Sequence, residues 1–259
     1  LAWRGLCVGT VYWGAWLLWS RDFRALATVA SGAGITLVLC QYFNAMLFPL
    51  GIAAAPVSVV LLAVATMPVW AAVLSRIFLG EQTSRATWIT IGAVLSGIGI
   101  AVSGKGSVAV NTAALTGALC GFGVALCLAL SFVTLRRMPH LPLLPALGTG
   151  ALMSGTTGLI LTGPERLIDG VVPAIMVTGL FILPVSFFAL AQASRRTQAA
   201  TVSLLMLLET VLGPVWVWLF LDEAPTARML TGGAIVLGAL ALYIRASQPR
   251  RRTVRSVAG

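Results

Sequence analysis

The chain is poor in charge and almost without histidine, and these shortages exclude several classes of protein. Charged residues make up 9% of its 259 positions, against roughly 25% in a soluble domain. A water-soluble protein of this size would need a more polar surface. One histidine, His140, is too few for histidine-based metal clusters and for histidine-dependent catalytic triads. The sequence therefore predicts no metal ion, no cofactor and no enzymatic activity.

Acidic residues are scarcer than basic ones, with 7 Asp and Glu against 17 Lys and Arg, so the net charge is +10. In a soluble protein this excess would suggest a nucleic-acid partner. Here the basic residues stand at the edges of apolar blocks, as the orientation signals of a membrane protein do. We therefore expect a lipid bilayer around the chain and no nucleic acid.

Apolar residues make up 59% of the chain and occur in blocks long enough to span a bilayer. A spanning helix needs about 20 such residues. The pattern predicts an all-α integral membrane bundle with nine helices in this chain. Their expected ranges are 1–19, 25–48, 55–79, 84–103, 112–134, 143–162, 170–193, 199–221 and 226–245.

The basic residues predict the orientation of these helices. With the C-terminus inside, only Arg4, Lys105, Arg166 and Arg228 fall outside, which leaves 13 of the 17 basic residues inside. Because basic residues favour the cytoplasmic side, we expect a cytoplasmic C-terminus and a basic cytoplasmic tail over 246–259. Leu1 would then start outside, so we expect one further helix before it.

The chain also repeats itself at an offset of 142 residues. Pro68 precedes Glu81 by 13 positions, and Thr210 precedes Glu223 by the same spacing, with a glycine-rich helix after each copy. Five predicted helices separate the copies, and this odd number inverts the second copy in the membrane. Inverted repeats are a common plan of secondary transporters. Both glutamates are expected to cap turns.

The same segments resemble the drug/metabolite transporter superfamily, specifically its EamA-like group. The matching pattern is an apolar helix with a proline, then a Leu–Gly–Glu turn, found here as Phe78–Leu79–Gly80–Glu81 and, modified, as Phe220–Leu221–Asp222–Glu223. The resemblance implies ten helices in two inverted repeats, over 1–105 and 106–245 here, with the first helix missing. It also implies export more often than uptake, and a prokaryotic cytoplasmic (inner) membrane.

Glu209 is the sharpest candidate site residue, because it lies near the middle of a predicted span. A charged carboxylate at that depth costs roughly 2.5–3.5 kcal/mol on insertion scales, so it marks a functional site by default. It could bind a substrate ammonium group or carry a coupling proton, or it could be a protonated side chain bonded to its neighbours. Met206 and Trp216 share its helical face.

Other polar and aromatic side chains inside the predicted spans complete the candidate substrate site. Arg4 could pair with a substrate carboxylate or extend to the interface. Gln41 and Asn44 are three residues apart on one helix face, so they either line a polar cavity or join helices. Trp70, with Trp216, could enclose an apolar or cationic substrate.

Three prolines inside predicted helices, Pro68, Pro184 and Pro214, are candidates for kinks or gating. Together these features favour a secondary transporter that exports small metabolites such as amino acids by alternating access, with protons as a candidate coupling ion and a homodimer as a candidate assembly. The alternatives are a non-transporting membrane scaffold or sensor and an integral membrane enzyme.

Overall fold

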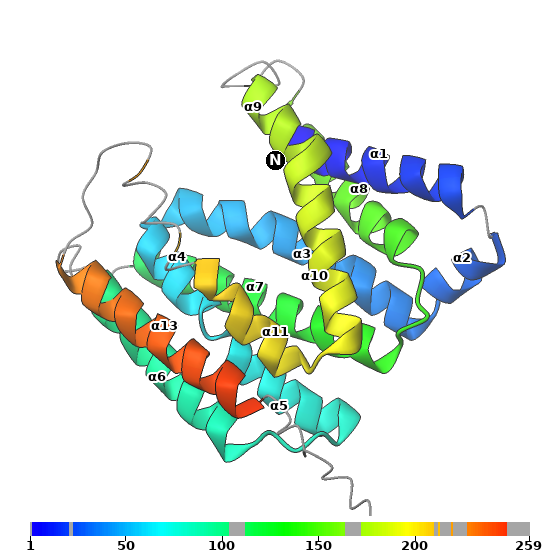
Figure 1. Ribbon diagram of the computed structural model, residues 1–259. Coiled ribbons are helices and arrows are strands. Elements are labelled where there is room, and N and C mark those ends of the chain that lie inside the picture. Colours follow the sequence, from blue (N-terminus) through cyan, green and yellow to red (C-terminus); the bar gives the residue numbers. More distant parts are fainter. Residues whose placement is uncertain are drawn as a thin grey trace, which may run out of the picture. The chain divides into compact units, whose positions relative to one another are not determined.

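A computed structural model of the protein (Figure 1) describes residues 2–20, 23–103, 112–163, 172–209 and 227–247, together with Leu212 and Leu219. Within these residues the secondary structure is helical, without strands. The described chain divides into two compact units, one of residues 1–83 and 105–207 and the other of 84–104 and 208–259. The two units are groups of residues in contact, whereas the predicted repeats 1–105 and 106–245 are consecutive stretches of sequence. The units therefore do not test the repeats, which stay a prediction.

Most helices belong to the first unit. They are α1 (Ala2–Trp19), α2 (Phe23–Val29), α3 (Gly32–Ala54), α4 (Val57–Val64), α5 (Met67–Leu79), α7 (Thr112–Arg137), α8 (Leu143–Thr162), α9 (Val172–Val177), the π-helix η2 (Thr178–Ile182), α10 (Leu183–Arg196) and α11 (Ala199–Met206). The second unit holds α6 (Arg85–Ser103) and α13 (Ala227–Ser247).

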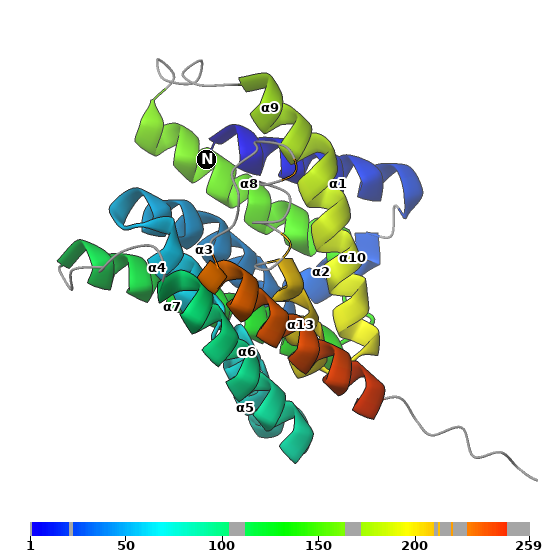
Figure 2. The same ribbon diagram turned by 60° about the vertical axis from the view of Figure 1, so that its left-hand side comes forward.

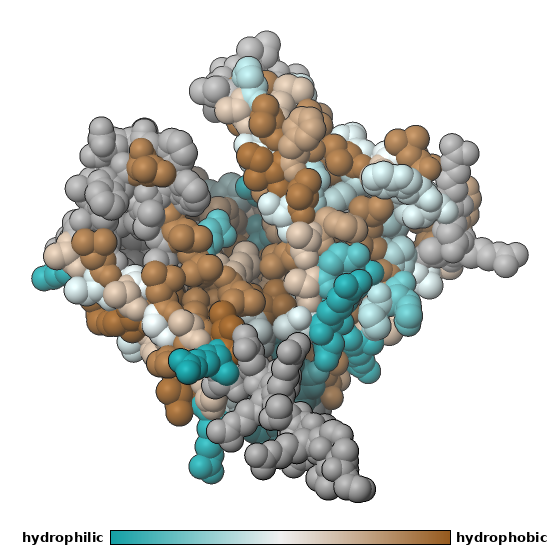
Figure 3. All heavy atoms as spheres, in the orientation of Figure 1, coloured by the Kyte–Doolittle hydropathy of each residue, from teal (hydrophilic) through white to brown (hydrophobic). Residues whose placement is uncertain are grey.

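Within the described part of the chain, five helical segments are long and apolar enough to cross a membrane: Gly32–Ala54, Val59–Leu79, Thr112–Arg137, Leu143–Thr162 and Val172–Arg196. Two shorter apolar helices lie at Arg85–Ile100 and Leu230–Arg245. Hydrophobic residues cover much of the face shown in Figure 3, as expected for a surface in contact with lipid. The predicted spans 1–19, 84–103 and 143–162 agree with α1, α6 and α8 to within one residue.

The span predicted at 25–48 is wrong as a single helix. The chain forms α2, turns at Ala30–Ser31, and forms α3 as far as Ala54. The Ser31 hydroxyl caps α3 by accepting the Gly34 N–H at 3.3 Å, and it donates to the Thr28 carbonyl at 2.6 Å. A Cβ at Gly34 would lie 2.3 Å from the Val29 carbonyl oxygen, so this turn requires glycine there.

The spans predicted at 55–79 and 199–221 are also interrupted. The first becomes α4 and α5 with a break at Ala65–Thr66. The second begins as α11, which ends at Met206, and after a turn at Leu207 the chain is helical again at Leu208 and Glu209. Both α4 and α11 have eight residues and start 142 positions apart. Their C-caps share a backbone conformation, with φ −61° and ψ −14° at Ala65 against φ −66° and ψ −12° at Leu207. Ala65 and Leu207 are thus equivalent positions, separated by the same 142 residues as the two copies of the sequence repeat.

The two described candidate prolines follow irregular turns. Pro68 is in the first turn of α5, where a missing backbone N–H costs little. Pro184 lies within the continuous helical segment Val172–Arg196, two residues after η2. The π-helix η2 directly precedes α10, and its wide turn is closed by a bond from the Leu183 N–H to the Thr178 carbonyl. Both prolines therefore follow irregular turns. Pro214 lies outside the described residues.

Small residues set the close helix contacts of the first unit. A Cβ at Gly5 of α1 would lie 2.5 Å from the Gly155 nitrogen of α8, and one at Gly121 of α7 would lie 2.6 Å from the Val60 carbonyl oxygen of α4. Helices in lipid associate through such close packing, because lipid offers no hydrophobic driving force between them. Gly5 and Gly121 are therefore contact residues between helices of the first unit.

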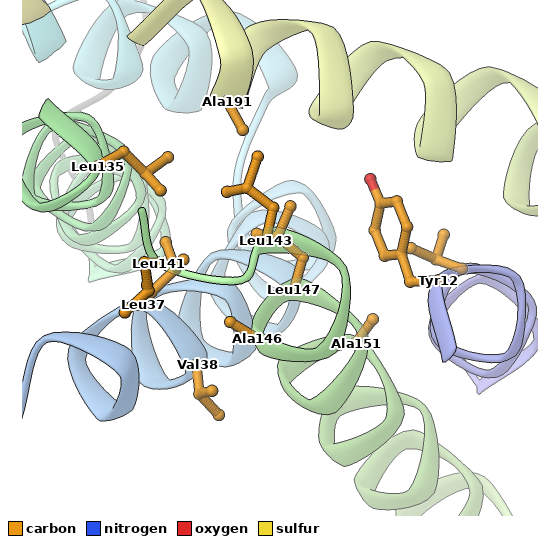
Figure 4. Close-up of a cluster of buried hydrophobic side chains, with 11 residues drawn as sticks. Tyr12, Leu37, Val38, Leu135, Leu141, Leu143, Ala146, Leu147, Ala151 and Ala191 are labelled. Atoms are coloured by element: carbon orange, nitrogen blue, oxygen red, sulfur yellow. The ribbon is translucent and has the colours of Figure 1, made fainter. Parts of the chain in front are cut away.

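A cluster of buried apolar side chains fills the space between α1, α3, α8 and α10 (Figure 4). Its members include Leu37, Leu143 and Leu147. Tyr12 is 2% exposed, and its hydroxyl, which points toward α10 in Figure 4, donates to the Pro184 carbonyl at 2.9 Å. This bond satisfies the buried hydroxyl and ties α1 to the start of α10.

In the second unit, α6 and α13 lie side by side (Figure 1, Figure 2). A Cβ at Gly97 would lie 2.8 Å from the Gly232 carbonyl oxygen, so glycines again set the spacing. Buried Val94 and Val236 pack in the same unit.

The two glycines of α1 provide a matched test of the α1–α8 contact. Gly5→Ala places a methyl group against the α8 backbone and should lower stability by about 1–3 kcal/mol. Gly14→Ala has no atom within 4 Å of the new Cβ, and better helix propensity should leave stability equal or raised. The apparent melting temperature of the purified protein measures both. Equal melting temperatures for the two variants would contradict the contact.

Candidate substrate site

The structure brings three of the predicted site residues, Arg4, Gln41 and Asn44, to one small cavity in the first unit. Arg4 comes from α1 and the two amides from α3, while α8 contributes Ser154 and α10 contributes Leu183 and Phe187. The cavity has a volume of about 20 Å³, which is room for about one water molecule. In this conformation it can enclose a small polar group but not a whole metabolite.

Close packing places the polar side chains at this cavity. Gly5, next to Arg4, lies against Gly155, so α1 approaches α8 closely. A Cβ at Gly150 of α8 would lie 2.6 Å from the Val38 carbonyl oxygen and 2.8 Å from the Gln41 Cβ, so α3 also approaches α8. The predicted face of Gln41 and Asn44 is thereby turned toward the cavity.

Arg4 carries more hydrogen-bonding capacity than the described residues use. Its guanidinium donates to the Ala45 carbonyl at 3.4 Å, which is a weak bond. Among the described residues no carboxylate lies within ion-pair distance of it, and the single ion pair found there joins Arg136 and Glu81. A guanidinium has five N–H donors in a planar fork that fits a carboxylate. Arg4 is therefore equipped to bind an anionic group.

The two amides are buried, with exposures of 8% for Gln41 and 9% for Asn44. Neither side chain has a hydrogen-bond partner within the described part of the chain. Ser154 is 1% exposed and donates to the Ala151 carbonyl at 2.8 Å. Neither amide is among the fully buried, unpaired side-chain groups of the described residues, which are Ser75 Oγ and Arg195 Nε, so both amides stay accessible to a ligand or water at the cavity.

A second, open cavity of about 290 Å³ adjoins the first and shares Arg4 with it. Its other lining residues are Ala174 and Ile175 of α9 and Thr178 of η2. Gly179 of η2 packs against α1, since a Cβ there would lie 3.0 Å from the Cys7 Cβ and 3.5 Å from the Arg4 Cα. The π-turn therefore lies beside Arg4, and such turns are frequent at functional sites.

Two further predicted site residues lie elsewhere in the first unit. Trp70 and Met206 instead pack against a second apolar cluster that includes Met67 and Val124. Glu209 belongs to the second unit, where its side chain is exposed, three residues after the end of α11. Trp216, like Pro214, lies outside the described residues.

A cluster of polar contacts, which we call the arginine cluster (Glu81, Arg136, Arg195 and the Leu141 carbonyl), joins four helix ends. Arg136 at the end of α7 pairs with Glu81 after α5 at 3.4 Å and donates to the Arg195 carbonyl of α10 at 3.2 Å. Arg195 in turn donates to the Leu141 carbonyl before α8.

Sequence reasoning identified Glu81 only as a turn cap and missed its partner. Gly80 adopts φ +65°, which favours glycine, and ends α5 so that Glu81 follows directly. The available signal was that Glu81, Arg136 and Arg195 all fall at predicted inside ends. Ser154 and Phe187 gave no such signal, because an isolated serine or phenylalanine in an apolar span is usually a packing residue.

Comparison with known proteins agrees with the fold and the composition. The model of the EamA-like transporter family matches residues 115–245, and the model of the Triose-phosphate Transporter family matches residues 2–127. Both families belong to the drug/metabolite transporter superfamily. No curated protein matched the chain.

Fourteen chains of solved structures resemble the fold. One of them, a crystal structure, superposes with a TM-score of 0.79 at 16% identity and covers 95% of this chain and 88% of its own. At that identity the likeness shows the fold alone. The family models and the apolar helices together show an all-α integral membrane transporter of small solutes. The chain belongs to the EamA-like transporter family.

Proposed function

We propose that the protein is a secondary transporter that exports small metabolites such as amino acids by alternating access. The observation that carries this proposal is the convergence of Arg4, Gln41 and Asn44 on one cavity. A cation and two amides are costly inside a membrane, and they are expected there when they bind a polar solute. Export is favoured by the family resemblance.

The interrupted helices support the proposed mechanism. In secondary transporters, substrate sites lie near discontinuous helices in corresponding positions of two inverted repeats. The breaks after Val64 and Met206 are 142 positions apart, and the second lies just before Glu209. We infer that Glu209 acts near this break, either on a substrate ammonium group or as the carrier of a coupling proton.

The arginine cluster supports the proposed orientation. Its members fall at the inside ends of the predicted spans, whereas Arg4 and the open cavity fall toward the outside ends. The helix ends joined by the arginine cluster are therefore ends that the charge distribution assigns to the same side of the membrane. This is consistent with a cytoplasmic C-terminus. A prokaryotic inner membrane is proposed as the location from the family resemblance alone.

We further propose that the arginine cluster is the inner gate of the alternating-access cycle. Its ion pair is partly exposed, at 31% for Arg136 and 26% for Glu81, and such pairs contribute about 0–1 kcal/mol. Arg195 Nε is buried and, within the described residues, unpaired, which offsets part of the stability of the cluster. Weak contacts of this kind can be broken at a modest free-energy cost, as a gate requires.

Export tests the proposed function directly. Cells overproducing the full-length protein should accumulate a defined set of small metabolites outside. Arg4→Gln and Glu209→Gln should each lower that export at least roughly tenfold, because each removes a charge that pairs with the solute or the proton. The measurement is the extracellular metabolite profile at matched membrane levels of protein.

Arg228→Gln is the control, since Arg228 is exposed on α13, and it should export normally. Full export by Arg4→Gln and Glu209→Gln would remove both residues from the mechanism. No enriched compound, together with a stable complex with another membrane protein, would favour a scaffold or sensor instead.

The gate is tested by distances between spin labels in lipid nanodiscs. Labels at Ile77 of α5 and Arg196 of α10 report the two helix ends that Arg136 joins, and both side chains are exposed. Glu81→Gln removes the ion pair and should increase the population with the longer distance. Arg137→Gln, an exposed neighbour of Arg136, should leave the distribution unchanged. An unchanged distribution in Glu81→Gln would contradict the gate.

A further inference from the structure

We infer that the transported solute is an organic anion with an apolar tail, whose charged head pairs with Arg4 and whose tail lies in the open cavity beside α9. This inference rests on the proposed function and names its substrate class. Of the two roles proposed for Glu209, it favours the carrier of a coupling proton, since such a solute has no ammonium group. It is carried by the two cavities that share Arg4, which differ in size and in chemistry.

The smaller cavity has room for one oxygen atom of the head of such a solute. Its space of about 20 Å³ corresponds to roughly one water molecule. Arg4, Gln41 and Asn44 all present N–H donors there, and no described carboxylate pairs with Arg4. Within the described residues the cavity therefore has a positive charge without a counter-ion. A carboxylate would use the guanidinium fork and the two amides together.

The open cavity fits the tail. At about 290 Å³ it is close to the lower bound of small-molecule sites, roughly 300 Å³. Its side chains beyond Arg4 are the methyl group of Ala174, the aliphatic chain of Ile175 and Thr178. The Thr178 hydroxyl already donates to the Ala174 carbonyl at 2.8 Å, so its hydrogen goes to the helix backbone. An aliphatic chain of a few carbons would bury apolar surface there.

Three probe compounds separate the contributions of head and tail. 4-Methylpentanoate has a carboxylate and a branched apolar tail, acetate has the head alone, and 4-methylpentylamine has a similar tail with a cationic head. Binding is measured for the purified protein in lipid nanodiscs by the shift in melting temperature across a ligand titration. 4-Methylpentanoate should bind at least roughly tenfold more tightly than acetate, because several more methylene groups leave water. The amine should cause no shift.

Two variants connect each contribution to its cavity. Ala174→Phe fills the open cavity without changing charge, so it should remove the advantage of 4-methylpentanoate over acetate. Ala193→Phe is the size-matched control, since Ala193 is exposed on α10 and does not line either cavity. Arg4→Gln should abolish the binding of both anions, and Arg4→Lys should retain a weaker response because the charge stays and the fork is lost.

Each contrary result overturns a named part of the inference. Binding of the amine as tight as that of 4-methylpentanoate would overturn the anionic head. Equal affinity for acetate and 4-methylpentanoate, or an unaltered preference in Ala174→Phe, would overturn the tail site. A protein that exports metabolites yet binds neither anion would retain the proposed function and lose this inference. Anion binding without export would support the binding site and contradict the proposed function.

Discussion

Close contact between α1 and α8 is the interaction on which the candidate substrate site depends. Lipid does not drive helices together as water does, so helix contacts in a membrane depend on backbones that can approach closely. Gly5 and Gly155 permit that approach, and Gly150 does the same between α8 and α3. The result is that Arg4 of α1 and the amides of α3 share a cavity, although about forty residues separate them in the chain.

The membrane environment also limits which polar side chains are candidates for function. A charge inside a bilayer is tolerated when it meets a partner or lines a cavity. Arg4 has a carbonyl partner at 3.4 Å and lines two cavities, while Arg136 and Arg195 are joined to carbonyls and to Glu81 at the helix ends. We propose different tasks for the two sets, with solute binding near the predicted outer ends and closure at the predicted inner ends.

Apolar run length and periodicity predicted most of the helices and the shared face of Gln41 and Asn44. They did not predict the breaks at Ala65–Thr66 and Leu207, because apolar residues continue on both sides of each break and hydropathy does not register a turn inside such a run. Pro68 was a signal for the first break, but its preference for a first helical turn indicates a helix start rather than a kink. The contacts of the arginine cluster could not be predicted from the sequence, since the paired residues are 55 and 59 positions apart and meet only in the folded chain. Glu209 stays a prediction.

The most direct measurement for the central claim is the distance between the bound carboxylate and the Arg4 guanidinium. Solid-state nuclear magnetic resonance can measure it in lipid bilayers, with ¹³C in the carboxylate of 4-methylpentanoate and ¹⁵N in the arginine side chains. Dipolar coupling at hydrogen-bond distance, assigned to Arg4 by its loss in Arg4→Lys, is the result expected. The site would be contradicted if the bound carboxylate showed no coupling to any arginine. It would also be contradicted if the coupling persisted in Arg4→Lys.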